Sequence, residues 1–102
     1  MFFVVVATDK PGALSVRMAN KAAHMAHLDA AAADVQVLQS GPWTDAGGVE
    51  AGSIIVLKAA NTEAVERFLA ADPYRRAGLF AHVEIRPWKW SRGNPYRATN
   101  TP

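Results

Sequence analysis

The chain has no cysteine among its 102 residues. This absence excludes a disulfide framework, a catalytic thiolate and metal sites that depend on cysteine ligands. Long hydrophobic runs are also missing, since the apolar run Phe2–Ala7 is far shorter than the about 20 residues that a membrane-spanning helix needs. The first residues lack the basic region that opens a signal peptide. We therefore expect a cytoplasmic protein with no membrane partner.

The chain also has only a small excess of positive over negative charge. Eleven Lys and Arg residues against nine Asp and Glu give a formal net charge of +2, with much of the basic excess after Arg86. Aromatic and basic residues alternate in Trp88-Lys89-Trp90-Ser91-Arg92, a pattern that suits stacking on nucleic-acid bases but more often packs a sheet edge or a dimer seam. Because no concentrated basic stripe accompanies it, we expect no nucleic-acid partner.

The composition is that of one small globular domain. Half of the residues are hydrophobic and a fifth are charged, as in ordinary folded domains. We expect the domain to span residues 1–90. Residues 91–102 are polar and rich in Pro, Gly and Asn, and we expect a flexible tail or an arm that crosses a partner.

Hydrophobic patterns predict four strands and two helices. The strands are expected at Phe2–Ala7, Val35–Ser40, Ser53–Lys58 and Ala81–Trp88. One helix lies within residues 9–31, and a second is capped by Asn61 or Thr62 and ends before Asp72-Pro73, followed by a short turn over residues 74–78. A loop over residues 41–48 separates the second and third strands. The order βαββαβ predicts a ferredoxin-like α+β sandwich, an antiparallel sheet with two helices on one face.

The second face of this sheet needs a cover, because the expected strands carry apolar residues on both faces. The first strand, a continuous apolar run, is expected to be buried on both sides. A second copy of the chain is the simplest cover, so we expect a homodimer formed through the sheet face.

The first helix carries the chemistry that stands out. Its predicted buried stripe consists of Leu14, Met18, Ala22, Met25 and Leu28. His24 lies at the margin of that stripe on the same side as Arg17, and Lys21 sits one turn earlier, within reach of His24. His27 points away from the stripe towards water.

Histidine suits general acid or base work because its charge changes near neutral pH. His24 is therefore a candidate catalytic residue, with a half-buried helix histidine of no special role as the alternative. Asp72 is a candidate partner that fixes the His24 tautomer and raises its basicity, with a simple helix-end carboxylate as the alternative. The 48 residues between them do not exclude contact, since both predicted helices pack on one sheet face.

The remaining patterns are weaker. Gly41-Pro42 falls at a strand end, where ligand sites are common, although such a pair often only makes a turn. No glycine-rich phosphate loop or nucleophile elbow occurs. His24 and His27 diverge on the helix surface, so we expect no metal site.

Taken in order, several short motifs resemble the YCII-related family. They are Arg17, His24 followed by Leu28, Gly41-Pro42, Gly52-Ser53, Ala71-Asp72-Pro73-Tyr74, Gly78-Leu79-Phe80 and the segment Val83–Lys89. The resemblance implies a ferredoxin-like protomer that dimerises through its sheet, the dimeric α+β barrel. It also implies a pocket around a His–Asp pair, which falls on His24 and Asp72.

The same resemblance implies a set of substrate-binding residues. Arg17 matches a helix arginine that contacts an anion, and Lys21 stands where many members have a second arginine. The other residues that it implies are Gly41, Pro42, Ser53 and Tyr74. Members commonly read Arg-Pro-x-His where this chain reads Lys21-Ala22-Ala23-His24, so the proline is missing here.

These observations lead to two hypotheses of different kinds. The first is an enzyme that uses His24 and Asp72 for acid–base chemistry without a cofactor, an isomerase or lyase acting on a small anionic or phenolic molecule. The family includes a dehydrochlorinase acting on a chlorinated hydroxyquinol, an analogy of fold and pocket rather than of substrate. The second hypothesis is a non-catalytic module that binds a small molecule in the same pocket.

Overall fold

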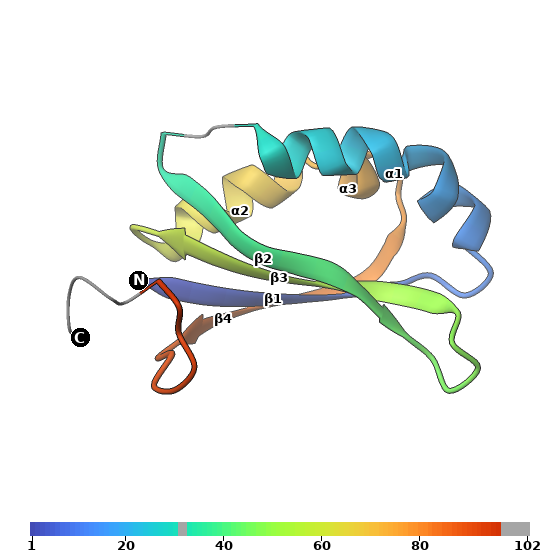
Figure 1. The fold of residues 1–102 in the computed structure, drawn as a ribbon. Coiled ribbons are helices and arrows are strands. Elements are labelled where there is room, and N and C mark those ends of the chain that lie inside the picture. Colours follow the sequence, from blue (N-terminus) through green and yellow to red (C-terminus); the bar gives the residue numbers. More distant parts are fainter. Residues whose placement is uncertain (31–32, 97–102) are drawn as a thin grey trace.

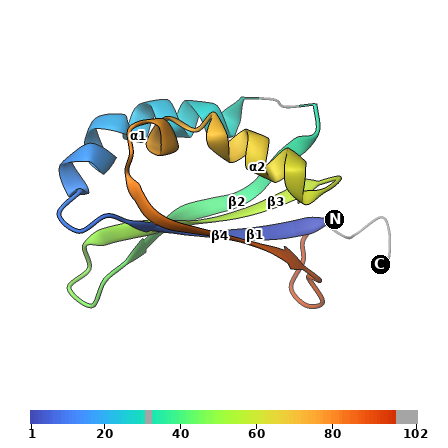
Figure 2. The same ribbon diagram turned by 180° about the vertical axis from the view of Figure 1, so that it is seen from behind.

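In the computed structural model, a four-stranded antiparallel sheet carries all its helices on one face (Figures 1 and 2). The structure describes residues 1–30 and 33–96. The elements are β1 (Phe2–Asp9), α1 (Leu14–Asp29), β2 (Val35–Thr44), β3 (Glu50–Ala59), α2 (Thr62–Ala70), α3 (Pro73–Arg76) and β4 (Phe80–Trp88). The predicted order and the ferredoxin-like α+β fold are confirmed, with α3 as the short helical turn expected after Asp72.

The sheet has the strand order β2-β3-β1-β4, which places β1 and β3 in its centre. Residues of these two strands alternate between the two faces. Phe3 and Val5 of β1 and Leu57 of β3 face the helices and are at most 1% exposed. Val83 and Ile85 of β4, predicted to share a face, pack partly buried against this core.

β1 is not buried on both faces within one chain, contrary to the expectation from its continuous apolar run. Phe2, Val4 and Val6 point to the face without helices and are only half-buried. This face is therefore apolar in its central strand and partly open.

Side-chain caps define the two short helices. The Asn61 side chain caps α2 by accepting a hydrogen bond of 2.9 Å from the Ala64 amide, as its residue type predicts. The Asp72 side chain caps α3 by accepting a bond of 2.9 Å from the Tyr74 amide. Pro73 follows at the first helical position, where its fixed φ suits the turn. The local sequence therefore fixes where the Asp72 carboxylate lies.

α1 buries a different face from the predicted one. Of the expected stripe only Leu28 is buried, while Leu14, Met18 and Met25 are 40%, 49% and 51% exposed. The buried side chains of α1 are Arg17, His24 and Leu28. They repeat with a spacing of seven and four residues, which makes an equally good stripe rotated by roughly 80° at about 100° per residue. Polar partners inside the protein, described below, select this second face.

His27 also lies differently from the prediction, which turned it towards water. Its ring stacks on Phe68 of α2 with centroids 4.4 Å apart, and its Nε2 lies 2.9 Å from the Phe68 carbonyl oxygen. The histidine therefore joins α1 to the end of α2.

β2 continues through the segment that was predicted to be a loop. Gly41, Pro42 and Trp43 pair with Ile54, Ser53 and Gly52 of β3. Proline is tolerated because β2 is an edge strand, where one side of the backbone has no ladder to complete. The turn itself comes later, where the Asp45 amide donates to the Val49 carbonyl over 2.9 Å.

Gly52 makes room for the Trp43 side chain. The indole lies against Gly52 and its Nε1 donates a 2.8 Å hydrogen bond to the Ala7 carbonyl oxygen of β1. A Cβ at position 52 would collide with this indole and with the Ala7 carbonyl. Trp43 therefore links β2 to β1 across β3.

We expect Gly52→Ala to lower the free energy of unfolding by about 1–3 kcal/mol, because overpacking forces side chains and backbone apart. Urea denaturation followed by circular dichroism measures this change. Gly41→Ala is the matched control in the neighbouring strand, since a Cβ there meets no atom within 4 Å. Equal stability of the two variants would contradict the prediction.

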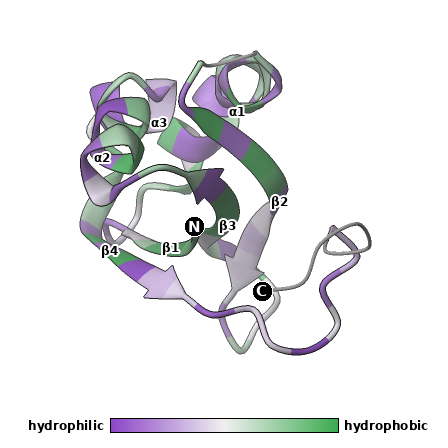
Figure 3. Cartoon of the chain, turned by 90° about the vertical axis from the view of Figure 1, so that its left-hand side faces the viewer, coloured by the Kyte–Doolittle hydropathy of each residue, from purple (hydrophilic) through white to green (hydrophobic). Residues whose placement is uncertain are grey.

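After β4, the chain turns back along the face that has no helices (Figure 3). Trp90 packs edge-on against Phe2 with centroids 5.6 Å apart, and stacks on Trp88 at 4.9 Å. The Tyr96 hydroxyl donates a 2.9 Å hydrogen bond to the Leu38 carbonyl of β2. Tyr96 of the predicted tail is thus hydrogen-bonded to the chain's own sheet, and residues 97–102 lie outside the described residues. None of the helices in the described part is long and apolar enough to cross a membrane.

Candidate active site

Arg17 is held in place by two side chains from the sheet. Its Nε and Nη2 donate to the two carboxylate oxygens of Asp9 over 2.7 and 3.0 Å, and Nη2 also donates to Ser53 Oγ over 2.9 Å. The residue is 2% exposed. Burial by itself lowers the pKa of Arg17, but the hydrogen bonds and charge of Asp9 outweigh it, so that the pKa is raised. Arg17 is therefore a permanently charged group inside the protein.

The guanidinium still has free donors. Its two Nη1 hydrogens have no hydrogen-bond partner among the described residues, and Arg17 lines a cavity. A planar guanidinium suits the oxygens of an anionic ligand. Arg17 thus binds Asp9 through Nε and Nη2, and its Nη1 group remains able to donate hydrogen bonds to a ligand.

His24 and Asp72 form a buried pair. The His24 Nδ1 atom lies 2.9 Å from both Asp72 oxygens, and the two residues are 6% and 1% exposed. A carboxylate only accepts hydrogen bonds, so Nδ1 must carry a hydrogen. In the neutral ring Nε2 then holds the lone pair, as a general base requires. The geometry therefore fixes which nitrogen of His24 is free to take a proton.

Tyr74 lies beside both of these groups. Its ring stacks on the His24 ring with centroids 3.9 Å apart and planes 12° apart, and the Arg17 Cζ atom lies over it at 4.7 Å. Burial raises the pKa of Tyr74, although the charges of Arg17 and Lys21 oppose the shift. The phenol is therefore neutral at physiological pH.

A cavity of about 140 Å³ connects these residues between α1, the strands β2 and β3, and α3. It is lined by Arg17, Lys21, His24, Met25, Ser40, Gly41, Pro42, Ser53, Ile54, Ile55 and Tyr74. Gly41 and Pro42 contribute to it from within β2, not from a loop. Seven of the eight site residues predicted from the sequence line the cavity. The eighth, Asp72, does not line it but contacts His24.

Lys21 does not reach His24 as the sequence suggested. Its Nζ donates to the two Glu50 oxygens over 2.8 and 3.1 Å, with 39% of the lysine side chain exposed. The lysine thus belongs to the partly open side of the cavity. Sequence reasoning missed both Asp9 and Glu50, since neither carboxylate has a local pattern that ties it to α1.

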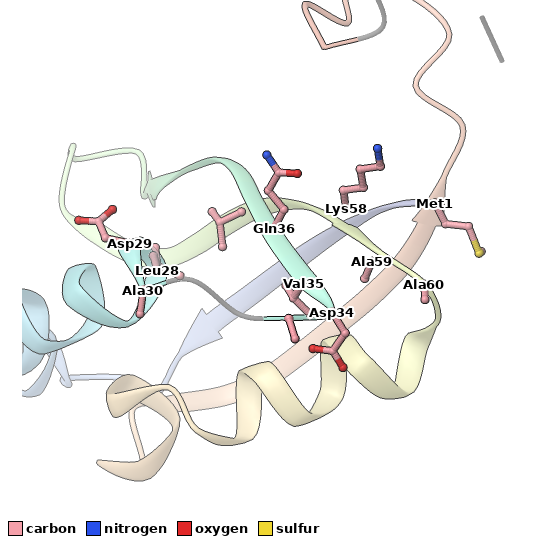
Figure 4. Close-up of a pocket in the computed structure, with 12 residues that line it drawn as sticks. Met1, Leu28, Asp29, Ala30, Asp34, Val35, Gln36, Lys58, Ala59 and Ala60 are labelled. Carbon is pink, nitrogen blue, oxygen red and sulfur yellow. The ribbon is translucent and has the colours of Figure 1, made fainter. Parts of the chain in front are cut away.

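Two larger surface pockets have only exposed charged or titratable side chains in their lining. One of about 640 Å³ opens between the end of α1 and the start of β2 (Figure 4). Its charged residues, Asp29, Asp34 and Lys58, are all exposed. The described residues contain no group of three or more His, Asp or Glu side chains placed to hold a metal ion. The small cavity is therefore the candidate site, because it combines a buried cation, a buried base and a phenol.

The protein is thus a small α+β domain with a pocket between its first helix and the sheet, where a few charged and polar side chains meet an apolar lining. The YCII-related domain model matches residues 1–89. Protein YciI of Escherichia coli O6:H1 is 32% identical over 95 residues, covering 87% of this chain and 97% of the relative. An uncharacterised protein of Haemophilus influenzae is 34% identical with the same coverage. The chain belongs to the YCII-related family.

Two solved structures share the fold of this chain. The 5-chloro-2-hydroxyhydroquinone dehydrochlorinase of Burkholderia phenoliruptrix AC1100, in complex with 2,5-dihydroxybenzoquinone, superimposes with a TM-score of 0.79. The two sequences are 35% identical, over 87% of this chain and 94% of the enzyme. PA3566 of Pseudomonas aeruginosa shares the fold, with a TM-score of 0.51 at 18% identity over 86% and 93% of the two chains. One structural neighbour is therefore a small-molecule enzyme of the same fold.

Proposed function

We propose that this chain is a small enzyme that performs acid–base chemistry, an isomerisation or an elimination, on a small anionic or phenolic molecule. The observation that carries the proposal is the buried His24–Asp72 pair, whose geometry leaves Nε2 of His24 as the basic nitrogen in a cavity that also holds Arg17. A base and a fixed cation in one cavity suit a reaction in which a proton leaves and negative charge develops.

Each residue has a distinct role in this proposal. His24 Nε2 accepts the proton, and Asp72 keeps the ring oriented and stabilises the imidazolium that forms. Arg17 holds negative charge on the substrate or the intermediate through its Nη1 donors. In an elimination, the electron pair that the lost proton leaves behind forms a new π bond as a halide departs with the electron pair of its carbon–halogen bond, so that the substrate loses one proton and one halide ion. Neither this step nor an isomerisation changes the total number of electrons, so neither requires a redox cofactor.

The solved dehydrochlorinase supports the choice of substrate class. It is 35% identical to this chain, and its structure holds a dihydroxybenzoquinone. A ring compound with acidic hydroxyl groups suits a cavity that contains a buried arginine and a base. We therefore take 5-chloro-2-hydroxyhydroquinone as the first compound to test.

We expect His24→Gln to reduce chloride release from 5-chloro-2-hydroxyhydroquinone by at least about 100-fold, since general acid–base groups contribute about 10²–10⁴-fold. Chloride release under anaerobic conditions measures the rate. His27→Gln is the matched control, the same substitution three residues later on α1 and outside the cavity. Full activity of the His24 variant would exclude the mechanism, and saturable binding without turnover by the wild type would favour a binding module.

We also propose a homodimer formed through the sheet face that carries no helices. The half-buried Phe2, Val4 and Val6 and the 42% exposed Ile54 support it, because these apolar side chains line one face of the central strands. Sedimentation equilibrium at micromolar concentration tests the proposal. A monomer under these conditions, or a dimer that persists in Val6→Lys, would exclude it.

A further inference from the structure

The Tyr74 hydroxyl is the only fully buried side-chain nitrogen or oxygen in the described part of the chain that has no hydrogen-bond partner. The residue as a whole is 0% exposed. Buried polar groups in native proteins are nearly always satisfied, so each exception calls for an explanation such as a ligand or a catalytic role. Tyr96, the other tyrosine, illustrates the ordinary case, because its hydroxyl donates to the Leu38 carbonyl.

The Tyr74 ring lies beside the charged residues of the cavity. Tyr74 lines the cavity together with Arg17 and Lys21, and the charges of both residues act on the phenol. The ring is held on two sides, by the stacked His24 at 3.9 Å and by Phe80, which meets it edge-on at 6.1 Å. The ring is thus packed into one orientation and does not turn away to find a protein acceptor.

The volume of the cavity limits the size of a ligand that could bind beside Tyr74. Its volume of about 140 Å³ is well below the roughly 300–1,000 Å³ of pockets for drug-sized ligands. A single six-membered ring with small substituents fits this scale. Such a ring, placed between His24 and Arg17, would bring its substituents close to Tyr74.

We propose that the Tyr74 hydroxyl donates a hydrogen bond to an ionised hydroxyl oxygen on the ring of the bound molecule, so that the site selects small cyclic compounds with such a negatively charged oxygen. This inference rests on the proposed function, because it concerns the molecule on which His24 acts. A neutral phenol donates and a negatively charged oxygen accepts, which makes a strong pair. The raised pKa of Tyr74 keeps that donor protonated. Arg17 Nη1 supplies a second donor to the same negative charge.

The experiment compares two quinones, one with two ionisable hydroxyl groups and one with methyl groups in their place. Isothermal titration calorimetry measures the binding of 2,5-dihydroxybenzoquinone and of 2,5-dimethylbenzoquinone to the wild type, Tyr74→Phe and Tyr96→Phe. We expect Tyr74→Phe to weaken binding of the dihydroxy compound at least about tenfold, the loss of one hydrogen bond to a charged group. It should change binding of the dimethyl compound less than twofold, and Tyr96→Phe should change neither.

Thermal unfolding supplies a readout that a merely structural role would move in the other direction. Removing an unpartnered buried hydroxyl leaves no bond broken, so Tyr74→Phe should unfold at the same temperature as the wild type or at a higher one. Tyr96→Phe should unfold at a lower temperature, because it loses the bond to Leu38.

Three results would overturn the inference. They are a destabilised Tyr74→Phe with unchanged affinity for the dihydroxy compound, equal weakening of both quinones, and no binding of the dihydroxy compound by the wild type at millimolar concentration. The proposed function fails separately, through undiminished chloride release by His24→Gln. A third outcome is that Tyr74→Phe weakens binding of the dihydroxy compound alone, while the wild type releases no chloride from 5-chloro-2-hydroxyhydroquinone. That outcome would support the inference and exclude catalysis on 5-chloro-2-hydroxyhydroquinone.

Discussion

Replacing Arg17 with methionine is expected to lower the free energy of unfolding by about 3–5 kcal/mol, the usual effect of breaking a buried ion pair from one side. The substitution removes three hydrogen bonds, two to Asp9 and one to Ser53. It leaves the Asp9 carboxylate, whose side chain is only 6% exposed, without its compensating charge. Urea denaturation followed by circular dichroism measures the loss.

The same substitution at a surface position provides the control. Arg67 pairs with Asp34, but these side chains are 66% and 48% exposed. Because exposed ion pairs contribute little, Arg67→Met should unfold almost as the wild type does. In addition, the double variant Asp9→Leu/Arg17→Met should recover part of the loss, since no charge is then left buried alone. An Arg17→Met protein as stable as Arg67→Met would show that the buried pair does not stabilise the fold.

Replacing Asp72 with asparagine is expected to reduce the rate of chloride release by about 10²–10⁴-fold, while the folded structure persists. The amide oxygen can still accept the hydrogen bond from the Tyr74 amide that caps α3. Its NH₂ group, however, would face His24 Nδ1 as a donor and stabilise the opposite tautomer. In a catalytic triad, the change from aspartate to asparagine holds the histidine in the wrong tautomer and lowers kcat by about 10⁴.

The tautomer itself can be measured without any substrate. In ¹⁵N-labelled protein, long-range ¹H–¹⁵N correlation spectra distinguish a protonated Nδ1 from a protonated Nε2. We expect the hydrogen of neutral His24 on Nδ1 in the wild type and on Nε2 in Asp72→Asn. Asp34→Asn is the control, because Asp34 is exposed and pairs with Arg67 instead. An unchanged tautomer in Asp72→Asn would mean that Asp72 does not orient His24.

Much of the architecture could be predicted from local sequence. Asn61 correctly marked the start of α2 and Asp72-Pro73 its end, because capping and the restriction before proline act within a few residues. Alternation in β4 correctly turned Val83 and Ile85 to one face. The segment Gly41-Pro42 was predicted wrongly as a loop, because pairing with β3 and an edge position outweigh the local preference of these residues for turns.

The candidate site was accessible from the sequence only in part. The motif resemblance and the expected topology pointed to His24 and Asp72, which are in contact, while their catalytic roles stay a prediction. Asp9 was out of reach, since it ends β1 and nothing in its neighbourhood indicates a pairing with Arg17. Glu50 was missed for the same reason, as it comes to Lys21 from 29 residues away.

The sequence by itself determined the order of the elements, because periodicity, β-propensity and caps are properties of a few neighbouring residues. The tertiary structure alone decided which face of α1 turns inward. Two stripes compete on that helix, one apolar through Met18 and Met25 and one that contains Arg17 and His24. A hydrophobicity pattern favours the first. The second is buried because Asp9, Ser53 and Asp72, on three other elements or their caps, satisfy its polar groups in three dimensions.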